Sequence, residues 1–504
     1  MRKIVLILAF FSLLILIAVG FFSQKDYEPT TLMKLKEKYS QKVNSSVDHS
    51  KFTSLQQNFS SPQHVTATCI ICHNKRHVEV MQSNHWNWER EEYVEGRGIV
   101  YLGKKNAINN FCIGTQGNEQ SCAKCHIGYG MTSEGMVYTD STNVDCLVCH
   151  DNTETYVKDL EKGGAPVSTL DFNAIAQSVG KHGDLDMAMF ETTKDIDVHM
   201  GIDGAKLQCV DCHTTEKHNI SGKVYSLSSM NLDRNTCEQC HTENPHDDNI
   251  LNEHSIKVAC QSCHIPTYAK ANSTKMYWDW STAGKLKDGE PYEEDDSLGN
   301  HTYLSIKGSF VWERNVVPDY IWFNGTASHY LEGDVIKDTT NPLVLNQLHG
   351  SYSDNESKIY PVKIHVANQP YDPINKILIQ PKLFAEKKGE GAFWKDFNWL
   401  TASEVGMKEA NLPFSGKISF IKTEMYWPVN HMVATKENTL DCKSCHQREN
   451  SRLTGLNDFY MPGRDYSKIV EVGGVWMLIL TLLGVFAHGA VRITLAVRSG
   501  KGKQ

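Results

Sequence analysis

Hydrophobicity along the chain changes most sharply near its N-terminus. Arg2 and Lys3 lead into a run over residues 4–22 that is apolar apart from Ser12. A basic start followed by an apolar stretch is typical of an export signal, and Ala18-Val-Gly20 is an acceptable cleavage site. The run is also close to the length of about 20 residues that spans a bilayer. Residues 1–23 are therefore predicted to be a cleaved signal peptide or a retained anchor.

A second apolar run near the C-terminus predicts a transmembrane helix over residues 470–494. Its centre, residues 472–491, holds one titratable side chain, His488, which is interpreted as an interfacial histidine or as a contact to a quinone or partner haem. Basic residues follow the run, and lysine and arginine favour the cytoplasmic side. We therefore expect a cytoplasmic tail over residues 495–504. The intervening chain is then expected on the periplasmic side of the inner membrane.

Between these ends the pattern of apolar and polar positions is weaker. Residues 266–440 hold seven of the ten tryptophans, and residues 310–312 and 320–323 have the pattern of short strands. Turns rich in Pro, Asn and Gly separate such segments. The pattern predicts an aromatic-rich mixed lobe over residues 266–440.

Composition narrows the class of protein. Hydrophobic residues make up 40% of the 504 residues and charged residues 22%, which excludes a disordered chain and a polytopic membrane protein. The formal net charge of −8 leaves no basic footprint, so nucleic acid is not an expected partner.

The cysteines carry the strongest chemical signal. Fourteen of the fifteen form C-x-x-C pairs, each followed directly by a histidine; the remaining one is Cys112. The seven motifs are Cys69/Cys72/His73, Cys122/Cys125/His126, Cys146/Cys149/His150, Cys209/Cys212/His213, Cys237/Cys240/His241, Cys260/Cys263/His264 and Cys442/Cys445/His446.

This pentapeptide is the attachment site of c-type haem, because two thiols bind the porphyrin covalently and the adjacent imidazole reaches the iron. Zinc knuckles or redox dithiols would not require the histidine after every pair, and a disulfide framework would not use only this spacing. The sequence therefore predicts seven covalently attached haems c.

The spacing of the motifs predicts how the chain is organised. Six of them crowd into a multihaem domain over residues 24–265, and the seventh lies with a linker in residues 441–468. Haem rather than aliphatic side chains would fill much of that domain. The predicted fold class is a multihaem cytochrome c fold, mainly α with irregular connections and a few short strands, with a haem-packed core and a C-terminal transmembrane helix.

Counting histidines gives the candidate distal ligands. Seven proximal histidines leave enough others for bis-histidine ligation throughout, which predicts low reduction potentials. The candidates are His49, His77, His85, His199, His218, His246 and His254 among the motifs, and His365 and His431 from the lobe. For each of them, a surface or core histidine is the alternative reading.

More specific strings resemble the octahaem tetrathionate reductase family, which is related to hydroxylamine oxidoreductase and pentahaem nitrite reductase. The resemblance spans about residues 45–456. It is carried by Asn109-Asn-Phe-Cys-Ile113, Ser121-Cys-Ala-Lys-Cys-His-Ile-Gly-Tyr-Gly130, Asn143-Val-Asp-Cys-Leu-Val-Cys-His-Asp151, Lys181-His-Gly-Asp-Leu-Asp186, Asp197-Val-His-Met-Gly201, Lys275-Met-Tyr-Trp-Asp-Trp280, Asn315-Val-Val-Pro-Asp319, Gln369-Pro-Tyr-Asp372 and Glu424-Met-Tyr-Trp-Pro428.

The resemblance implies a catalytic haem on the second motif. Lys181 would be its unusual axial ligand and Cys112 would lie beside the pocket, with His182 and Asp184 as further candidate catalytic residues. A lysine amine binds iron only when it is neutral, so Lys181 would have to be desolvated. From the residues alone, Lys181 reads as a surface lysine, and Cys112 as a buried inert thiol or a thiol that pairs between chains.

One departure from the family leaves two functions open. Family members carry an eighth motif just before the lysine, whereas here residues 178–180 run straight into Lys181. The first hypothesis is a reductase of a small sulfur or nitrogen oxyanion, or of hydroxylamine, in contact with the quinone pool or a membrane redox partner. The second is a non-catalytic conduit that passes electrons to periplasmic electron-transfer proteins. An oligomer is compatible with both.

Overall fold

The computed structural model describes residues 49–57, 59–94, 96–110, 114–119, 127–130, 138–150, 156–159, 165–166, 186–190, 192–222, 230–231 and 234–500. The predicted N-terminal signal or anchor lies outside these residues. The chain divides into two compact units, Met1–Asn58 with Glu238–Thr242, and Phe59–Cys237 with Glu243–Gln504.

The described part of the first unit is small. It holds two short 3-10 helices, η1 (His49–Lys51) and η2 (Thr53–Leu55), and the rings of His49 and Phe52 meet edge to face with centroids 5.9 Å apart. Cys240 and His241 of the fifth haem motif belong to the same unit.

The haem-bearing part of the second unit consists of short helices and two-stranded ribbons. Its first helix, α3 (Pro62–Cys72), starts at Ser61, whose side chain accepts a hydrogen bond from the backbone N–H of His64, and Pro62 suits the first helical position. The other elements are α4 (Arg76–Gln82), α5 (Asn84–Asn87), β1 (Glu89–Val94), β2 (Gly98–Gly103), η4 (Ser141–Asn143), α7 (Leu147–His150), β3 (Lys158–Asp159), β4 (Ala165–Pro166), η5 (Met187–Met189), α9 (Cys209–Cys212), β5 (Thr215–Glu216), β6 (Asn219–Ile220), α10 (Asn249–His254) and α11 (Cys260–His264). A further 3-10 helix, η6 (Cys237–Gln239), begins in this unit, and its last two residues belong to the first unit.

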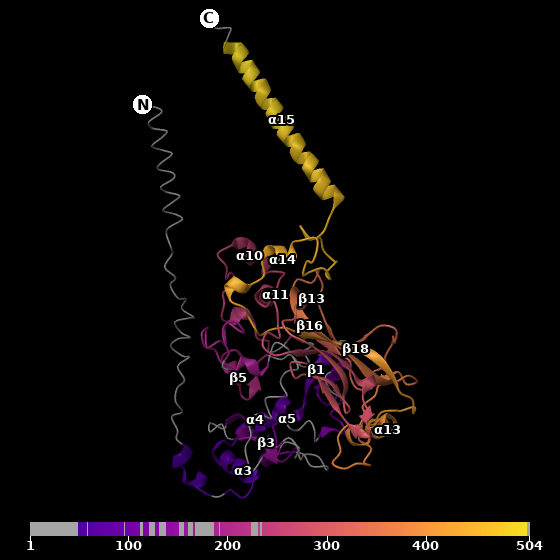
Figure 1. Cartoon of the computed structure of the whole chain (residues 1–504). Helices are drawn as coiled ribbons and strands as arrows, with labels where there is room; N and C mark the ends of the chain where they lie inside the picture. Colours follow the sequence, from indigo (N-terminus) through magenta and orange to yellow (C-terminus); the bar gives the residue numbers. More distant parts are fainter. Residues whose placement is uncertain are drawn as a thin grey trace. The chain divides into compact units, whose positions relative to one another are not determined.

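A ten-stranded sheet dominates the chain that follows. Its order is β10-β11-β12-β7-β16-β18-β15-β14, and β13 and β17 also pair with β16. The strands are β7 (Thr274–Asp279), β10 (Glu293–Asp295), β11 (His301–Leu304), β12 (Gly308–Glu313), β13 (Asp319–Phe323), β14 (Ala327–His329), β15 (Leu343–Leu348), β16 (Lys358–Asp372), β17 (Ile377–Leu378) and β18 (Ser419–Pro428), with the ribbon β8 (Leu286–Lys287) and β9 (Glu290–Pro291) beside them. Figure 1 shows β16 and β18 running alongside each other, as their antiparallel register requires.

Helices pack against this sheet and close its core. They are η7 (Trp280–Thr282), α12 (Phe393–Asp396) and α13 (Trp399–Glu409), and η8 (Lys436–Asn438) and α14 (Cys442–Cys445) follow the last strand. One buried cluster includes Trp278, Trp280, Phe310, Leu383 and Phe393. The region therefore has an apolar core of its own.

The expectation of a mainly α fold with a few short strands is wrong. The predicted strand segments 310–312 and 320–323 do lie in β12 and β13, but the long central strand β16 was not recognised. Residues 362–366 alternate between apolar and polar side chains, but the polar ones, Lys363 and His365, are buried, and the two prolines of the segment argue against a central strand.

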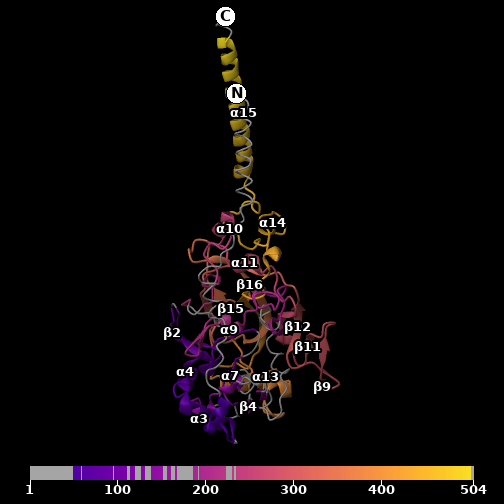
Figure 2. The same cartoon turned by 90° about the vertical axis from the view of Figure 1, so that its left-hand side faces the viewer.

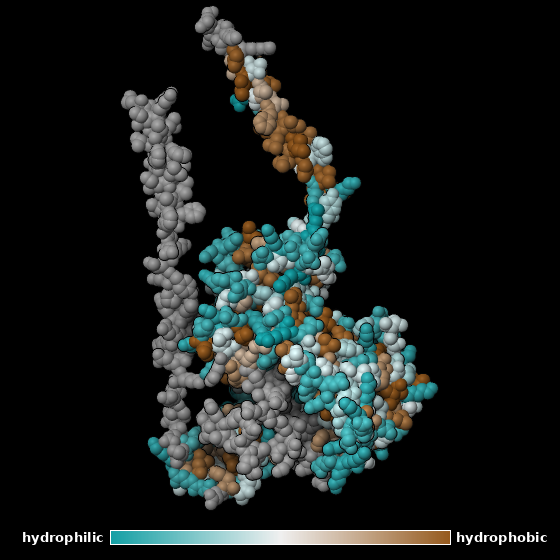
Figure 3. All heavy atoms as spheres, viewed as in Figure 1, coloured by the Kyte–Doolittle hydropathy of each residue, from teal (hydrophilic) through white to brown (hydrophobic). Residues whose placement is uncertain are grey.

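The chain ends in α15 (Lys468–Gly500). Within the described residues, Lys468–Val497 is the one helix long and apolar enough to cross a membrane, with a mean hydropathy of 2.2. Figure 3 shows apolar side chains along most of its length. A C-terminal helix of the kind predicted for residues 470–494 is therefore present.

Candidate haem sites and the catalytic segment

Most of the described CxxCH motifs form short helical turns; Cys69 and Cys72 instead lie at the C-terminal end of the eleven-residue α3, and Cys146 directly precedes α7. In α7, α9, α11 and α14 the second cysteine lies three residues after the first and the histidine follows it, so the three side chains lie close together on the helix surface. Side-chain caps start two of these turns: Asp441 accepts hydrogen bonds from Ser444, and Gln208 and Asp211 form a reciprocal capping box. The motif sequence thus determines the local structure.

Groups that a porphyrin would cover are exposed at these motifs. Cys72, Cys149, Cys209, Cys212, Cys240 and Cys442 are exposed. The apolar residues between the cysteines are exposed as well, with Ile71 at 73% and Val210 at 64%. Large exposed aliphatic side chains beside exposed thiols fit covalent attachment of an apolar macrocycle.

Among the described residues, four histidine pairs join a proximal histidine to a second histidine across a nearly constant gap. The ring centroids are 6.4 Å apart in His150/His218, 6.2 Å in His213/His431, 6.1 Å in His246/His264 and 6.0 Å in His254/His446. Two metal–nitrogen bonds of about 2 Å, plus about 1 Å from each nitrogen to its ring centre, give a spacing of about 6 Å. The pairs therefore fit bis-histidine ligation of one iron each.

Hydrogen bonds orient these rings. The Nδ1 atoms of His213, His254 and His446 lie 2.7–2.8 Å from the backbone carbonyls of Ser221, Ile250 and Pro462. A carbonyl oxygen only accepts hydrogen bonds, so Nδ1 carries the proton and Nε2 is left to bind a metal.

His218 differs because its Nδ1 lies 2.9 Å from a carboxylate oxygen of Glu79. This hydrogen bond is the largest cause that lowers the pKa of Glu79. A carboxylate partner makes a ligating imidazole more basic than a backbone carbonyl does.

The proximal histidine His213 leaves no room for a side chain at position 222, which is a glycine. A Cβ at Gly222, which has a φ of +81°, would lie 2.7 Å from Cε1 and Nδ1 of His213. The backbone after β6 therefore passes directly beside this ring, next to the Ser221 carbonyl that accepts a hydrogen bond from His213 Nδ1.

Neighbouring motifs lie close together. The pKa of Cys146 is raised to about 11, with burial as the largest cause and the charge of Cys69 from the first motif as the next. Burial likewise raises the pKa of Cys263 to about 11, with the charge of Cys445 as the next cause. Figures 1 and 2 both show α10, α11 and α14 lying together; these helices contain His254, Cys260–His264 and Cys442–Cys445 of the last two sites. The first and third sites and the sixth and seventh sites are therefore neighbours.

The His150 imidazole is held neutral. Burial lowers its pKa, and the nearby His218 and His73 lower it further. A neutral imidazole is the form that binds a metal.

The other predicted distal ligands occupy varied surroundings. His49 lies in η1 and His85 in α5, while His77 in α4 has a buried Nδ1 without a hydrogen-bond partner. His199 Nδ1 lies 3.8 Å from Asp197 Oδ1. These four histidines stay candidates.

His365 lies fully buried on β16, with Nδ1 2.9 Å from Asn110 Oδ1. Burial lowers its pKa well below the usual value, and the charges of Lys363 and Lys275 act in the same direction. It is therefore a neutral imidazole that supports the Asn110 segment, and its role as a ligand stays a prediction.

The residues assigned to catalysis lie outside the described part of the chain. They are Lys181, Cys112, His182 and Asp184, together with Cys122, Cys125 and His126 of the second motif. Their arrangement therefore stays a prediction.

The segment just before Cys112 is described, and a polar network that sequence reasoning missed holds it. Asn110 is fully buried and donates to the carbonyl of His365 at 2.7 Å. Gln369 donates to the carbonyl of Asn109 at 3.2 Å and accepts from Thr423 at 2.7 Å. The resemblance strings that contain Asn109 and Gln369 were the available signal. The chain that leads into Cys112 is thus fixed to β16 and β18.

A buried carboxyl group lies near the segment between Cys112 and Cys122. Burial raises the pKa of Glu332 to about 7, and the charge of Glu119 adds to the effect. Its Oε1 has no hydrogen-bond partner among the described protein atoms. At neutral pH this carboxyl group is close to half protonated.

Comparisons with known proteins agree with the haem chemistry. Residues 275–449 match a family described as bacterial cytochrome c, and residues 178–242 match the family of cytochrome c554 and c-prime. No curated protein matches the sequence significantly. Together with the seven motifs and the paired imidazoles, these matches define a multihaem c-type cytochrome.

A solved structure narrows this assignment. Octaheme cytochrome c from Shewanella oneidensis is 42% identical to this chain with a TM-score of 0.73, and the match covers 81% of this chain and 96% of that one. The chain belongs to the same family of multihaem c-type cytochromes.

Proposed function

We propose that this protein is a periplasmic, membrane-anchored cytochrome with seven haems c that delivers electrons to a catalytic haem on Cys122, Cys125 and His126. The paired imidazoles carry the electron-transfer part of the proposal. Four histidine pairs have nearly the same ring spacing. The first and third haem sites are neighbours, and so are the sixth and seventh. Bis-histidine ligation of this kind suits electron transfer at low potential.

The catalytic part rests on the resemblance to the octahaem tetrathionate reductase family. The neutral amine of Lys181 would help to hold this haem, and the substrate would be a small sulfur or nitrogen compound of the tetrathionate, nitrite or hydroxylamine type. When bound there, the haem would supply the electrons. The chain contributes the neutral amine of Lys181, the thiol of Cys112, and the network around Asn110 that fixes the approach to Cys112.

The C-terminal helix points to a membrane partner. Arg448, two residues after His446, forms an ion pair of 2.6 Å with Glu471 in the first turn of α15. This contact ties the seventh haem site to the start of the apolar helix. It supports electron exchange between that site and the quinone pool or a membrane redox partner, with periplasmic redox proteins reached from other haems.

Replacement of Lys181 tests the catalytic part. Lys181→Ala is expected to change the spin state of one haem in the EPR spectrum and to abolish reduction of the substrate. Lys287→Ala, at an exposed position of β8, is the matched control and is expected to change neither. An unchanged spectrum and unchanged turnover in Lys181→Ala would overturn the assignment.

A non-catalytic conduit is the second candidate function. The observation in its favour is that each of the four imidazole pairs has a spacing that would let both histidines bind one iron. It requires every haem to be six-coordinate, so nitrite added to the oxidised protein and carbon monoxide added to the reduced protein would leave the spectra unchanged. A ligand-accessible haem would exclude this function.

A further inference from the structure

The chain after the seventh haem motif folds back onto the histidine of that motif. His446 Nδ1 donates a hydrogen bond of 2.8 Å to the backbone carbonyl of Pro462. At the next residue, Gly463, the backbone has a φ of +87°, and a Cβ would lie 2.9 Å from the carbonyl oxygen of His446. Only glycine suits both this conformation and this spacing. Residues 462–463 therefore pack directly against the proximal ligand.

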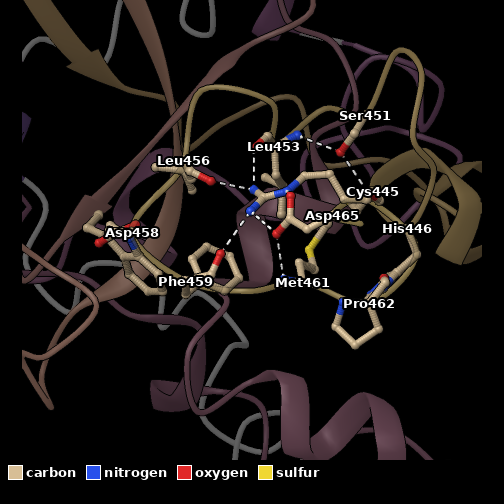
Figure 4. Close-up of polar contacts among 12 residues, drawn as sticks. Cys445, His446, Ser451, Leu453, Leu456, Asp458, Phe459, Met461, Pro462 and Asp465 are labelled. Atoms are coloured by element: carbon tan, nitrogen blue, oxygen red, sulfur yellow. Dashed lines mark hydrogen bonds and ion pairs between the residues drawn. The ribbon is translucent and has the colours of Figure 1, made fainter. Parts of the chain in front are cut away.

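A buried guanidinium group holds the same segment from the other side. Arg464 donates to the backbone carbonyls of Leu453 at 2.7 Å, of Phe459 at 3.0 Å and of Leu456. Figure 4 shows these carbonyl groups converging. A planar group with donors in a fixed fork can gather several carbonyls in this way, and burial without such partners would be costly.

Asp465 connects this guanidinium group to the residues that precede Pro462. Its carboxylate accepts two hydrogen bonds from Arg464, each of 2.7 Å, and one from the backbone N–H of Met461, also of 2.7 Å. The hydrogen bond from Arg464 is the largest cause that lowers the pKa of Asp465. The charged pair thereby fixes the chain on both sides of Pro462.

A separate contact docks the same loop on the sheet. Asp458 accepts hydrogen bonds from Trp322 Nε1 at 2.9 Å and from the backbone N–H of Tyr352 at 3.2 Å. Neither bond involves Pro462 or the Arg464/Asp465 pair. Asp458 therefore contributes to loop stability without fixing the carbonyl that faces His446.

We propose that Arg464 and Asp465 are positioning residues that set the reduction potential of the haem at the seventh motif. By holding the Pro462 carbonyl, they keep the hydrogen bond from His446 Nδ1 short. A ligating imidazole with a strong acceptor at its second nitrogen is a more basic ligand, which stabilises the ferric state. The pair thus lowers the potential of the haem nearest in sequence to α15. This inference depends on haem attachment at Cys442 and Cys445, and not on the substrate or on the role of Lys181.

The first test uses the full-length, haem-loaded protein in a redox titration followed by EPR and absorbance. In Arg464→Gln the guanidinium fork is lost, and one haem component is expected to move to higher potential while the others stay in place. Arg464→Lys keeps the charge without the fork and is expected to give a smaller shift in the same direction. His254→Met replaces the opposite ligand of the same site and marks which component belongs to it, because methionine raises the potential.

A second variant reaches the same hydrogen bond without removing a charge. Gly463→Ala pushes the segment away from His446, so it is expected to raise the potential of the component marked by His254→Met. Asp458→Asn is the matched control: it is expected to lower the thermal unfolding temperature but to leave all potentials unchanged.

The outcomes separate a positioning role from a merely structural one. If Arg464→Gln folds with its full haem content and the marked component does not move, the proposal is wrong. If Arg464→Gln does not fold, Gly463→Ala decides: a shift of the marked component supports the proposal and an unchanged potential overturns it. An equal shift in Asp458→Asn would also overturn it, because general loosening of the loop would then be the cause.

Discussion

The haem-bearing segment and the sheet that follows it bury apolar surface in different ways. The sheet closes its own core, in which Phe393 and Leu383 are fully buried. In the haem-bearing segment the described cluster of Val80, Trp86 and Val144 is small, and motif residues such as Val210 are exposed. In the haem-bearing segment the cofactor is expected to replace an apolar core, whereas the sheet has its own core. The stability of the haem-bearing segment should therefore depend on haem, and that of the sheet should not.

The largest expected effect follows from expression of the chain without haem attachment. Cofactor binding that organises a site contributes to the folding free energy of that site. Hydrogen exchange is therefore expected to show lost protection in α3, α9 and α11, while β7, β16 and β18 keep theirs. Protection of both regions without haem would break the comparison.

A core substitution tests the opposite side of the comparison. Phe393→Ala is expected to lower the unfolding free energy of the sheet region by about 3–5 kcal/mol, because a fully buried aromatic ring leaves a cavity. The centroid of its ring lies 4.1 Å from that of Trp399, with the two ring planes tilted by 30°. Chemical denaturation followed by hydrogen exchange in β7 measures the effect.

Leu400→Ala on α13 is the control for this substitution, because Leu400 is 45% exposed and its truncation leaves no cavity. Leu400→Ala is expected to lower the free energy of unfolding by well under half as much as Phe393→Ala. The haem absorption spectrum of the folded Phe393→Ala protein should match that of the parent. A changed spectrum would show that the core of the sheet and the haem sites are not separate.

The pH dependence of stability sharpens the picture of the sheet region. Glu332 has a folded-state pKa of about 7, above its ordinary value, so the folded protein holds this proton after the unfolded chain has lost it. The contribution of Glu332 to the free energy of unfolding is therefore largest below about pH 4.5. This contribution is lost as the pH rises through about 7. With allowance for partial exposure, Glu332→Gln should stabilise the protein by about 2 kcal/mol at pH 8 and hardly at pH 5.

Thermal unfolding at the two pH values measures this difference. Glu404→Gln, at an exposed position of α13, is the control and should show no such difference. An equal effect of Glu332→Gln at both pH values would mean that Glu332 is not protonated in the folded state.

The smallest effect concerns one haem within the haem-bearing segment. His218 faces the carboxylate of Glu79, whereas His213, His254 and His446 face backbone carbonyls. Glu79→Gln should raise the potential of one haem in a redox titration, because a neutral amide is a weaker acceptor. Glu253→Gln, at an exposed position of α10, should leave every potential in place.

Sequence patterns predicted the local features and missed those that depend on distant contacts. A CxxCH turn is specified by five adjacent residues, and α15 by a continuous apolar run, so both could be read directly. His431 and His246 were among the predicted distal ligands, but their partners His213 and His264 could not be assigned, because folding brings distant segments together. The strand β16 was missed because two prolines interrupt it and because its buried side chains include the polar Lys363 and His365, the reverse of the usual pattern.

The paired imidazoles are the central claim, and His431→Ala tests it most directly. His431 comes from the chain after the sheet and faces His213 at 6.2 Å, so its loss should convert one low-spin haem to a high-spin, ligand-accessible haem in the EPR spectrum. His301→Ala, which removes an exposed histidine that contacts Asp295, should leave the spectrum unchanged. A folded His431→Ala protein with all its haems and an unaltered low-spin spectrum would contradict the account.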